Sequence, residues 1–179
     1  WDRRGMVVGQ VQSGKTSNYI GLICKAVDAG YRIIIILAGW NNNDLRSQTQ
    51  IRIDNGFLGF DTQMTRALKQ DTTRIGAGLF SGDTFLASLS FTSSAENGDF
   101  KRSTAEQTGN LGNDPAVFVV KKNTRMLENL VNWFQVLPQA IRSTDSDRKV
   151  IRELPLLLID DEADNASINI RTGAHVNPQ

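Results

Sequence analysis

GQVQSGKT, residues Gly9–Thr16, decides how this 179-residue chain is expected to fold, because it fits the phosphate-binding pattern G-x-x-x-x-G-K-[ST] at every fixed position. Glycines let the backbone curl so that successive N–H groups point at an anion, and a following helix adds the partial positive charge of its N-terminus. Lys15 then reaches the β- and γ-phosphates of a nucleotide, and the Thr16 hydroxyl is a ligand for Mg²⁺. The stretch therefore predicts a nucleotide-binding loop.

The residues on either side of the loop fit a strand–loop–helix unit. Met6–Val8 is a short apolar run that predicts a buried strand leading into the loop. Beyond the loop, apolar side chains recur at helical spacing, at Ile20, Ile23, Ala26 and Val27. A glycine-containing turn with an exposed lysine is the alternative, and the flanking strand and helix argue against it.

A second segment, far downstream, supplies the expected partner of this loop. Leu156–Ile159 is a continuous apolar run, typical of a central strand that is covered on both faces, and it leads into Asp160–Asp164. A carboxylate at the C-terminal end of a buried strand is the expected Mg²⁺-side partner of a phosphate loop. An adjacent glutamate can polarise an attacking water. The alternative is an acidic helix N-terminus, where Asp and Glu are favoured in any protein.

Asp161–Asp164 spells DEAD, and with its preceding strand it resembles the corresponding motif of superfamily-2 helicase-like ATPases. Longer stretches resemble the bacterial Z-one domain family: RGMVVG (4–9), SGKTSNYIGL (13–22), LRSQTQ (45–50) and IDDEADNASIN (159–169). That family is commonly labelled an endonuclease domain and tends to occur in restriction-like, phage-defence settings. The similarity covers most of the chain and is thinnest between about residues 60 and 115.

The resemblance implies a RecA-like P-loop NTPase fold with ATP and Mg²⁺ as cofactors. It implies phosphate contacts at Gly14, Lys15 and Thr16, Mg²⁺ at Asp161, and activation of the attacking water by Glu162. The loop pattern makes Thr16 the second metal ligand. The remaining loop residues expected to surround the cofactor are Gly9, Gln12 and Ser13.

Between the two motifs, strands alternate with helices, which predicts a mainly parallel sheet with helices on both faces in a single domain, residues 1–179. Strands are expected over Tyr31–Ala38 and Ala116–Val120. Helices are expected from Asp44, as N-cap, to about Ile53 and from about Thr124 to Leu137. Phe91–Pro115 is rich in Ser, Thr, Asn and Gly, which predicts a long surface loop or partly disordered insertion.

Composition fits a globular enzyme domain in a reducing cytoplasm. Hydrophobic residues make up 40% of the chain, and 20 Lys plus Arg against 19 Asp plus Glu leave a net charge of +1. Any contact with DNA must therefore come from a local patch. The single cysteine, Cys24, cannot form an internal disulfide, and no apolar stretch approaches the length of a membrane span, so we expect no membrane partner.

Two segments are candidates for contact with nucleic acid. Arg46, Gln48 and Thr49 follow the second expected strand, where superfamily-2 proteins place a motif that grips the phosphate backbone. Lys121 and Lys122 stand at the end of the next long strand, beside a helix N-terminus that also favours phosphate. The alternative is a solvated helix face and an ordinary pair of lysines.

The expected function is Mg²⁺-dependent ATP hydrolysis coupled to movement on, or remodelling of, DNA in a restriction or phage-defence setting. The chain opens on Trp1 and its first motif follows almost at once, so we expect a fragment that holds the N-terminal helicase lobe. The resemblance implies that a second RecA-like lobe supplies an arginine to the γ-phosphate, so we expect the fragment alone to hydrolyse ATP very slowly. No Glu-x-Lys nuclease signature is present, so if the parent protein cuts DNA, its nuclease module is expected elsewhere. The alternatives are a nucleotide-gated scaffold or switch that touches no nucleic acid and, less favoured, a P-loop kinase with its lid within Asp61–Pro115.

Overall fold

The computed structural model describes residues 3–8, 14–63, 73–80, 88–108, 111, 113–142, 149–151, 154–161 and 163. Its helices are α1 (Lys15–Asp28), α2 (Asn43–Ile53), the π-helical turn η1 (Asp54–Leu58), the 3₁₀ turn η2 (Gly76–Leu79), α3 (Arg102–Thr108) and α4 (Thr124–Val136). Its strands are β1 (Ile33–Leu37), β2 (Leu89–Ser90), β3 (Ala116–Val120), β4 (Ile141–Arg142), β5 (Lys149–Val150) and β6 (Leu156–Asp160).

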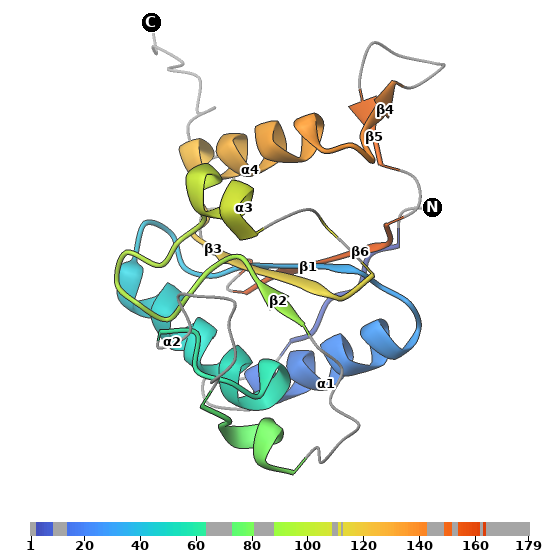
Figure 1. The fold of residues 1–179 in the computed structure, drawn as a ribbon. Helices are drawn as coiled ribbons and strands as arrows, with labels where there is room; N and C mark the ends of the chain where they lie inside the picture. Colours follow the sequence, from blue (N-terminus) through green and yellow to red (C-terminus); the bar gives the residue numbers. More distant parts are fainter. Residues whose placement is uncertain are drawn as a thin grey trace, which may run out of the picture.

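A four-stranded parallel sheet forms the centre of the fold, in the order β2-β3-β1-β6 (Figure 1). Ile33 of β1 stands opposite both Ala116 and Leu156, so the three longest strands begin and end in register. Helices α3 and α4 lie on one face of the sheet, and α1 and α2 lie on the other (Figure 1). The mixed α/β architecture with a parallel sheet is therefore as expected. Among the described residues, no helix is both long and apolar enough to cross a membrane.

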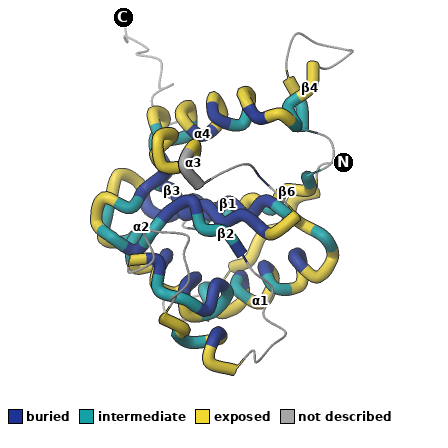
Figure 2. Tube along the Cα trace, in the orientation of Figure 1, coloured by how far each residue is buried: buried dark blue, intermediate teal, exposed yellow. Residues whose placement is uncertain are grey.

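Strands β1 and β3 are buried over their whole length, because each is an apolar, largely β-branched run covered on both faces (Figure 2). Their side chains alternate between two hydrophobic clusters. The cluster beneath α1 and η1 contains Ile34, Ile36, Val117 and Val119 together with Ile23, Val27, Ile53 and Leu58. The cluster beneath α4 contains Ile33, Ile35 and Phe118 together with Phe91, Phe100, Leu130 and Trp133.

Two of the expected strand environments are wrong. Met6–Val8 forms no strand, and its three apolar side chains are exposed. Strand β6 occupies the expected residues but is not central: within the described part of the chain it pairs only with β1 and closes one edge of the sheet. Leu158 is accordingly 55% exposed, because no described segment covers that side of the strand.

The segment expected to be a surface loop or insertion, Phe91–Pro115, is instead packed where it is described. It contains helix α3, and Phe91, Phe100 and Leu111 enter the cluster beneath α4. These apolar side chains are widely spaced in a polar background, so they carry no periodic signal.

The start of α2 also differs from the expectation. Asn42, not Asp44, caps the helix, because its Oδ1 accepts from Asp44 N at 2.9 Å and from Leu45 N at 3.2 Å. Asp44 instead lies in the first helical turn, where its charge favours the helix N-terminus.

Candidate functional site

The parallel strands β1, β3 and β6 all end at the same side of the sheet, its carboxyl end, where ligands bind in open α/β folds. Leu37, Val120 and Asp160 are the last residues of these strands and are in register with one another. The Asp161 N–H donates to Leu37 O at 3.0 Å, which fixes the residue after β6 beside the end of β1. Backbone pairing with β1 therefore fixes Asp160 and Asp161 at the carboxyl end of the sheet.

The N-terminus of α1 is a second part of this region. Gly14 is its N-cap, with a φ of 79° that favours glycine, and no side chain of the described residues caps the helix. The first turn carries no acidic side chain. The N–H groups of the first turn and the helix dipole together suit an anion at this position.

One tyrosine joins these two parts. The Tyr19 hydroxyl donates to Asp161 Oδ2 at 3.4 Å, and a guanidinium N–H of Arg52 donates to Thr16 Oγ1 at 3.3 Å. Burial is the largest cause that raises the pKa of Tyr19 to about 12, the charge of Asp161 adds to it, and a hydrogen bond with Thr16 and the charge of Arg52 oppose it. Tyr19 therefore remains a protonated donor at neutral pH. The first turn of α1, the last turn of α2 and the end of β6 converge on this phenol.

The other predicted nucleotide-site residues divide into two groups. Lys15 lies in the first turn of α1 with an exposed side chain. Four predicted residues lie outside the described residues: Gly9, Gln12, Ser13 and Glu162.

The predicted metal ligands are two in number, Thr16 and Asp161. Over the described ranges, no group of three or more His, Cys, Asp or Glu side chains could hold a metal ion. Magnesium bound together with a nucleotide needs only one or two protein ligands, because phosphate oxygens and water fill the other positions. A threonine hydroxyl and an aspartate on either side of Tyr19 fit that requirement.

The two lysines after β3 have partners within the protein. Lys122 is buried, and its ammonium group lies 2.6 Å from Asp160 Oδ1, so it joins the ends of β3 and β6. This corrects the expectation that Lys122 contacts nucleic acid. Lys121 donates to Asn43 Oδ1 at 2.7 Å and lies 3.7 Å from Asp99 Oδ2, but it remains partly exposed.

Arg46 and Thr49 also lie in the interior, which corrects the expectation that they contact nucleic acid. Arg46 is 0% exposed and donates to the carbonyl oxygens of Ser93, at 2.9 Å, and Ala95, at 2.7 Å. Burial lowers the pKa of Arg46. Of the three residues predicted on this helix, only Gln48 is exposed.

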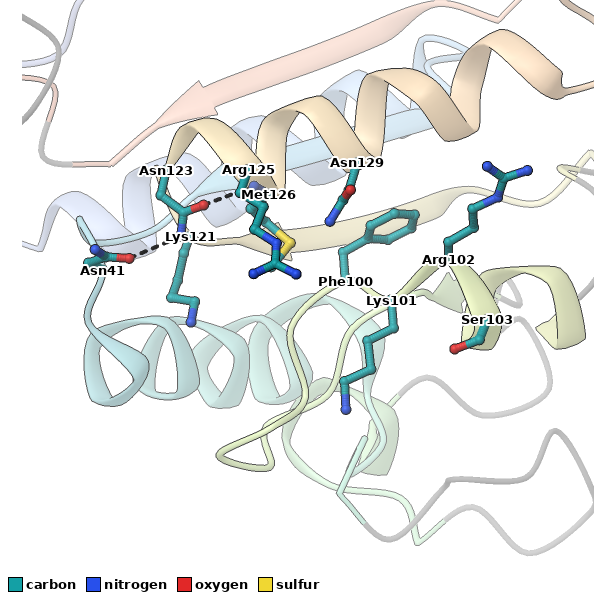
Figure 3. Close-up of a pocket in the computed structure, with 10 residues that line it drawn as sticks. All are labelled: Asn41, Phe100, Lys101, Arg102, Ser103, Lys121, Asn123, Arg125, Met126 and Asn129. Carbon is teal, nitrogen blue, oxygen red and sulfur yellow. Dashed lines mark hydrogen bonds between the residues drawn. The ribbon is translucent and has the colours of Figure 1, made fainter.

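A cationic groove opens nearby between the beginnings of α3 and α4 (Figure 3). Its volume is about 780 Å³, and it shares no residue with the Thr16–Asp161 region. Its basic lining residues are Lys101, Arg102, Lys121 and Arg125, and Asn123 and Asn129 add amide groups. The sequence prediction included only Lys121, because the other cations come from a segment expected to be a loop and from a helix chosen for its apolar face. The sequence feature that could have indicated this groove is the adjacent basic pair Lys101–Arg102.

Comparison with protein-family models, with curated proteins and with solved structures found no match to this chain. The likeness to the Z-one family therefore remains a resemblance carried by the quoted motifs. Residues and geometry carry the functional proposal.

Proposed function

We propose that this chain binds ATP and Mg²⁺ where α1, α2 and β6 meet, as the RecA-like lobe of a helicase-like ATPase that acts on DNA in a restriction or phage-defence setting. The observation that carries the proposal is the convergence of Thr16 and Asp161 on Tyr19. The described ends of two distant motifs, Gly14–Thr16 and Asp160–Asp161, lie together at the carboxyl end of a parallel sheet. The resemblance to superfamily-2 ATPases gives the same pairing.

Each residue of the proposed nucleotide site has a chemical role. Lys15 and the N–H groups in the first turn of α1 hold the β- and γ-phosphates. Thr16 and Asp161 bind Mg²⁺, and the hydrogen bond from Tyr19 to Oδ2 orients the Asp161 carboxylate. Magnesium, when bound, neutralises charge on the phosphate oxygens. Glu162 orients the attacking water.

Lys15→Ala is expected to weaken the binding of ATP in the presence of Mg²⁺ about 10- to 100-fold, because it removes charge-assisted hydrogen bonds to phosphate. Asp161→Asn is expected to abolish most of the increase in affinity that Mg²⁺ causes. Calorimetric titration of the chain with ATP, with Mg²⁺ or with EDTA, measures both effects. Lys25→Ala, at an exposed lysine in the last turn of the same helix, is the matched control and should bind as wild type does. Wild-type affinity in Lys15→Ala would remove the phosphate loop from the proposal.

The cationic groove supports the DNA part of the proposal. Lys101, Arg102, Lys121 and Arg125 line one depression. Two acidic side chains lie next to it, because Arg102 pairs with Glu106 at 2.8 Å and Lys121 lies 3.7 Å from Asp99. Such a surface suits the sugar–phosphate backbone, which is bound through charge and without base recognition. It takes the place of the interior residues Arg46 and Thr49 as the candidate contact surface.

Arg125→Ala is expected to weaken the binding of a fluorescein-labelled single-stranded oligonucleotide to a similar degree for every sequence, because it removes one phosphate contact. The magnitude of the slope of log K against log salt concentration should fall by about 1. Fluorescence anisotropy at several salt concentrations measures both quantities. Arg142→Ala, at an exposed arginine on β4 that does not line the groove, is the control. Equal slopes for Arg125→Ala and wild type would exclude the groove as the binding surface.

A further inference from the structure

We propose that Arg52 supplies, from within this chain, the cation that contacts the terminal phosphate of the bound nucleoside triphosphate. This inference rests on the proposed nucleotide site. It adds the residue by which that site distinguishes a triphosphate from a diphosphate.

The position of Arg52 is the first observation. It stands in the last turn of α2, and its Nη1 lies 3.3 Å from Oγ1 of Thr16, the hydroxyl expected to bind Mg²⁺. The charge of Arg52 also opposes the rise that burial causes in the pKa of Tyr19, and the Tyr19 hydroxyl in turn donates to Asp161. The guanidinium therefore lies at the group of side chains where the phosphates and the metal are expected. Its side chain is exposed, so a ligand can reach it.

The backbone that carries Arg52 is fixed by close packing. Helix α2 continues directly into η1, and a Cβ added at Gly56 would lie 2.8 Å from Cδ1 of Ile20 on α1. The buried Asp54 carboxylate accepts from Gln50 Nε2 at 2.9 Å and from Thr62 Oγ1 at 2.6 Å. The first contact packs η1 against α1, and the hydrogen bonds of Asp54 join the residues on either side of Arg52 to each other and to Thr62. The side chain of Arg52 alone needs to move to reach a phosphate.

The chemistry of the hydroxyl explains why the arginine would turn to the phosphate. Thr16 Oγ1 accepts a hydrogen bond from Arg52 here, and coordination of Mg²⁺ would use the same oxygen. The Arg52 guanidinium and a Mg²⁺ ion at Thr16 would repel each other at this distance unless an anion lay between them. A terminal phosphate supplies such an anion, and the planar guanidinium can bind two of its oxygens at once. A nucleoside diphosphate lacks this group, so it gains nothing from Arg52.

The test is the ratio of the dissociation constants for ATP and ADP, both measured by calorimetry in the presence of Mg²⁺. Arg52→Ala is expected to weaken ATP binding about tenfold and ADP binding less than about twofold, since one charge-assisted contact is lost only with ATP. Arg52→Lys should lie between, because it keeps the charge but not the planar fork. Lys25→Ala, at an exposed lysine in the last turn of α1, should leave both constants unchanged.

The other outcomes separate this inference from the proposed function. Equal weakening of ATP and ADP by Arg52→Ala, or no weakening of either, overturns the role of Arg52. If Lys15→Ala loses both nucleotides at the same time, the nucleotide site itself still stands. If the wild-type chain binds neither nucleotide, the proposed function and this inference both fail. Thermal unfolding of each variant verifies that the compared proteins are folded.

Discussion

Arg46→Ala is expected to lower the free energy of unfolding by about 3–5 kcal/mol, because it removes a fully buried guanidinium whose charge offsets that of the buried Asp99. The guanidinium donates to the carbonyl oxygens of Ser93 and Ala95, and the truncated side chain would leave both without this donor in the interior. Burial raises the pKa of Asp99, and the charge of Arg46 opposes that rise. Loss of the cation therefore leaves this carboxyl group buried with less compensation.

Urea unfolding followed by circular dichroism measures this loss, and Arg52→Ala provides the matched comparison. Arg52 lies on the same helix with an exposed side chain and a long hydrogen bond, of 3.3 Å, to Thr16 Oγ1, so its removal should cost less than about 1 kcal/mol. Similar losses in both variants would show that burial of Arg46 does not stabilise the fold.

Phe118→Ala is expected to cost about 3–5 kcal/mol, the usual range for removing a buried aromatic ring. Phe118 is fully buried at the centre of β3. Its ring stacks on Phe91 with centroids 4.7 Å apart, and it contacts Phe100, Trp133 and Phe134 at centroid distances of 5.9, 5.8 and 5.6 Å. The substitution removes the ring that touches every other aromatic of this cluster.

The same denaturation measurement tests this prediction, with Phe80→Ala as the control. Phe80 is 89% exposed, so its truncation should change stability by less than about 0.5 kcal/mol. A Phe118→Ala protein that unfolds within 1 kcal/mol of wild type would mean that the aromatic cluster repacks around the gap.

The sequence predicted the elements whose pattern is local. The apolar runs of β1 and β3 and the helical spacing of α1 and α4 are confirmed at nearly the expected bounds. Phe91–Pro115 was misjudged because Phe91, Phe100 and Leu111 are far apart in a polar segment. Such residues become core only through contacts with β3 and α4, which no local period records.

The candidate site shows the same division between local and distant information. The phosphate-loop pattern and the carboxylate after an apolar strand paired Thr16 with Asp161, and both lie around Tyr19. Arg46 looked like a surface cation, since nothing in a polar helix reveals that carbonyl groups of a distant loop will surround its guanidinium. Arg52 was missed as a site residue for the converse reason, because its neighbour Thr16 lies on another helix.

The position of β6 at the end of the described sheet has a practical consequence. Leu156–Asp160 presents backbone amides and carbonyls that no strand of the described chain pairs on its outer side. An unpaired margin of this kind can form backbone hydrogen bonds with any extended polypeptide, and the exposed Leu158 adds an apolar contact. Concentrated samples of this polypeptide are therefore at risk of joining through that margin, and low protein concentration is the appropriate condition for every titration described above.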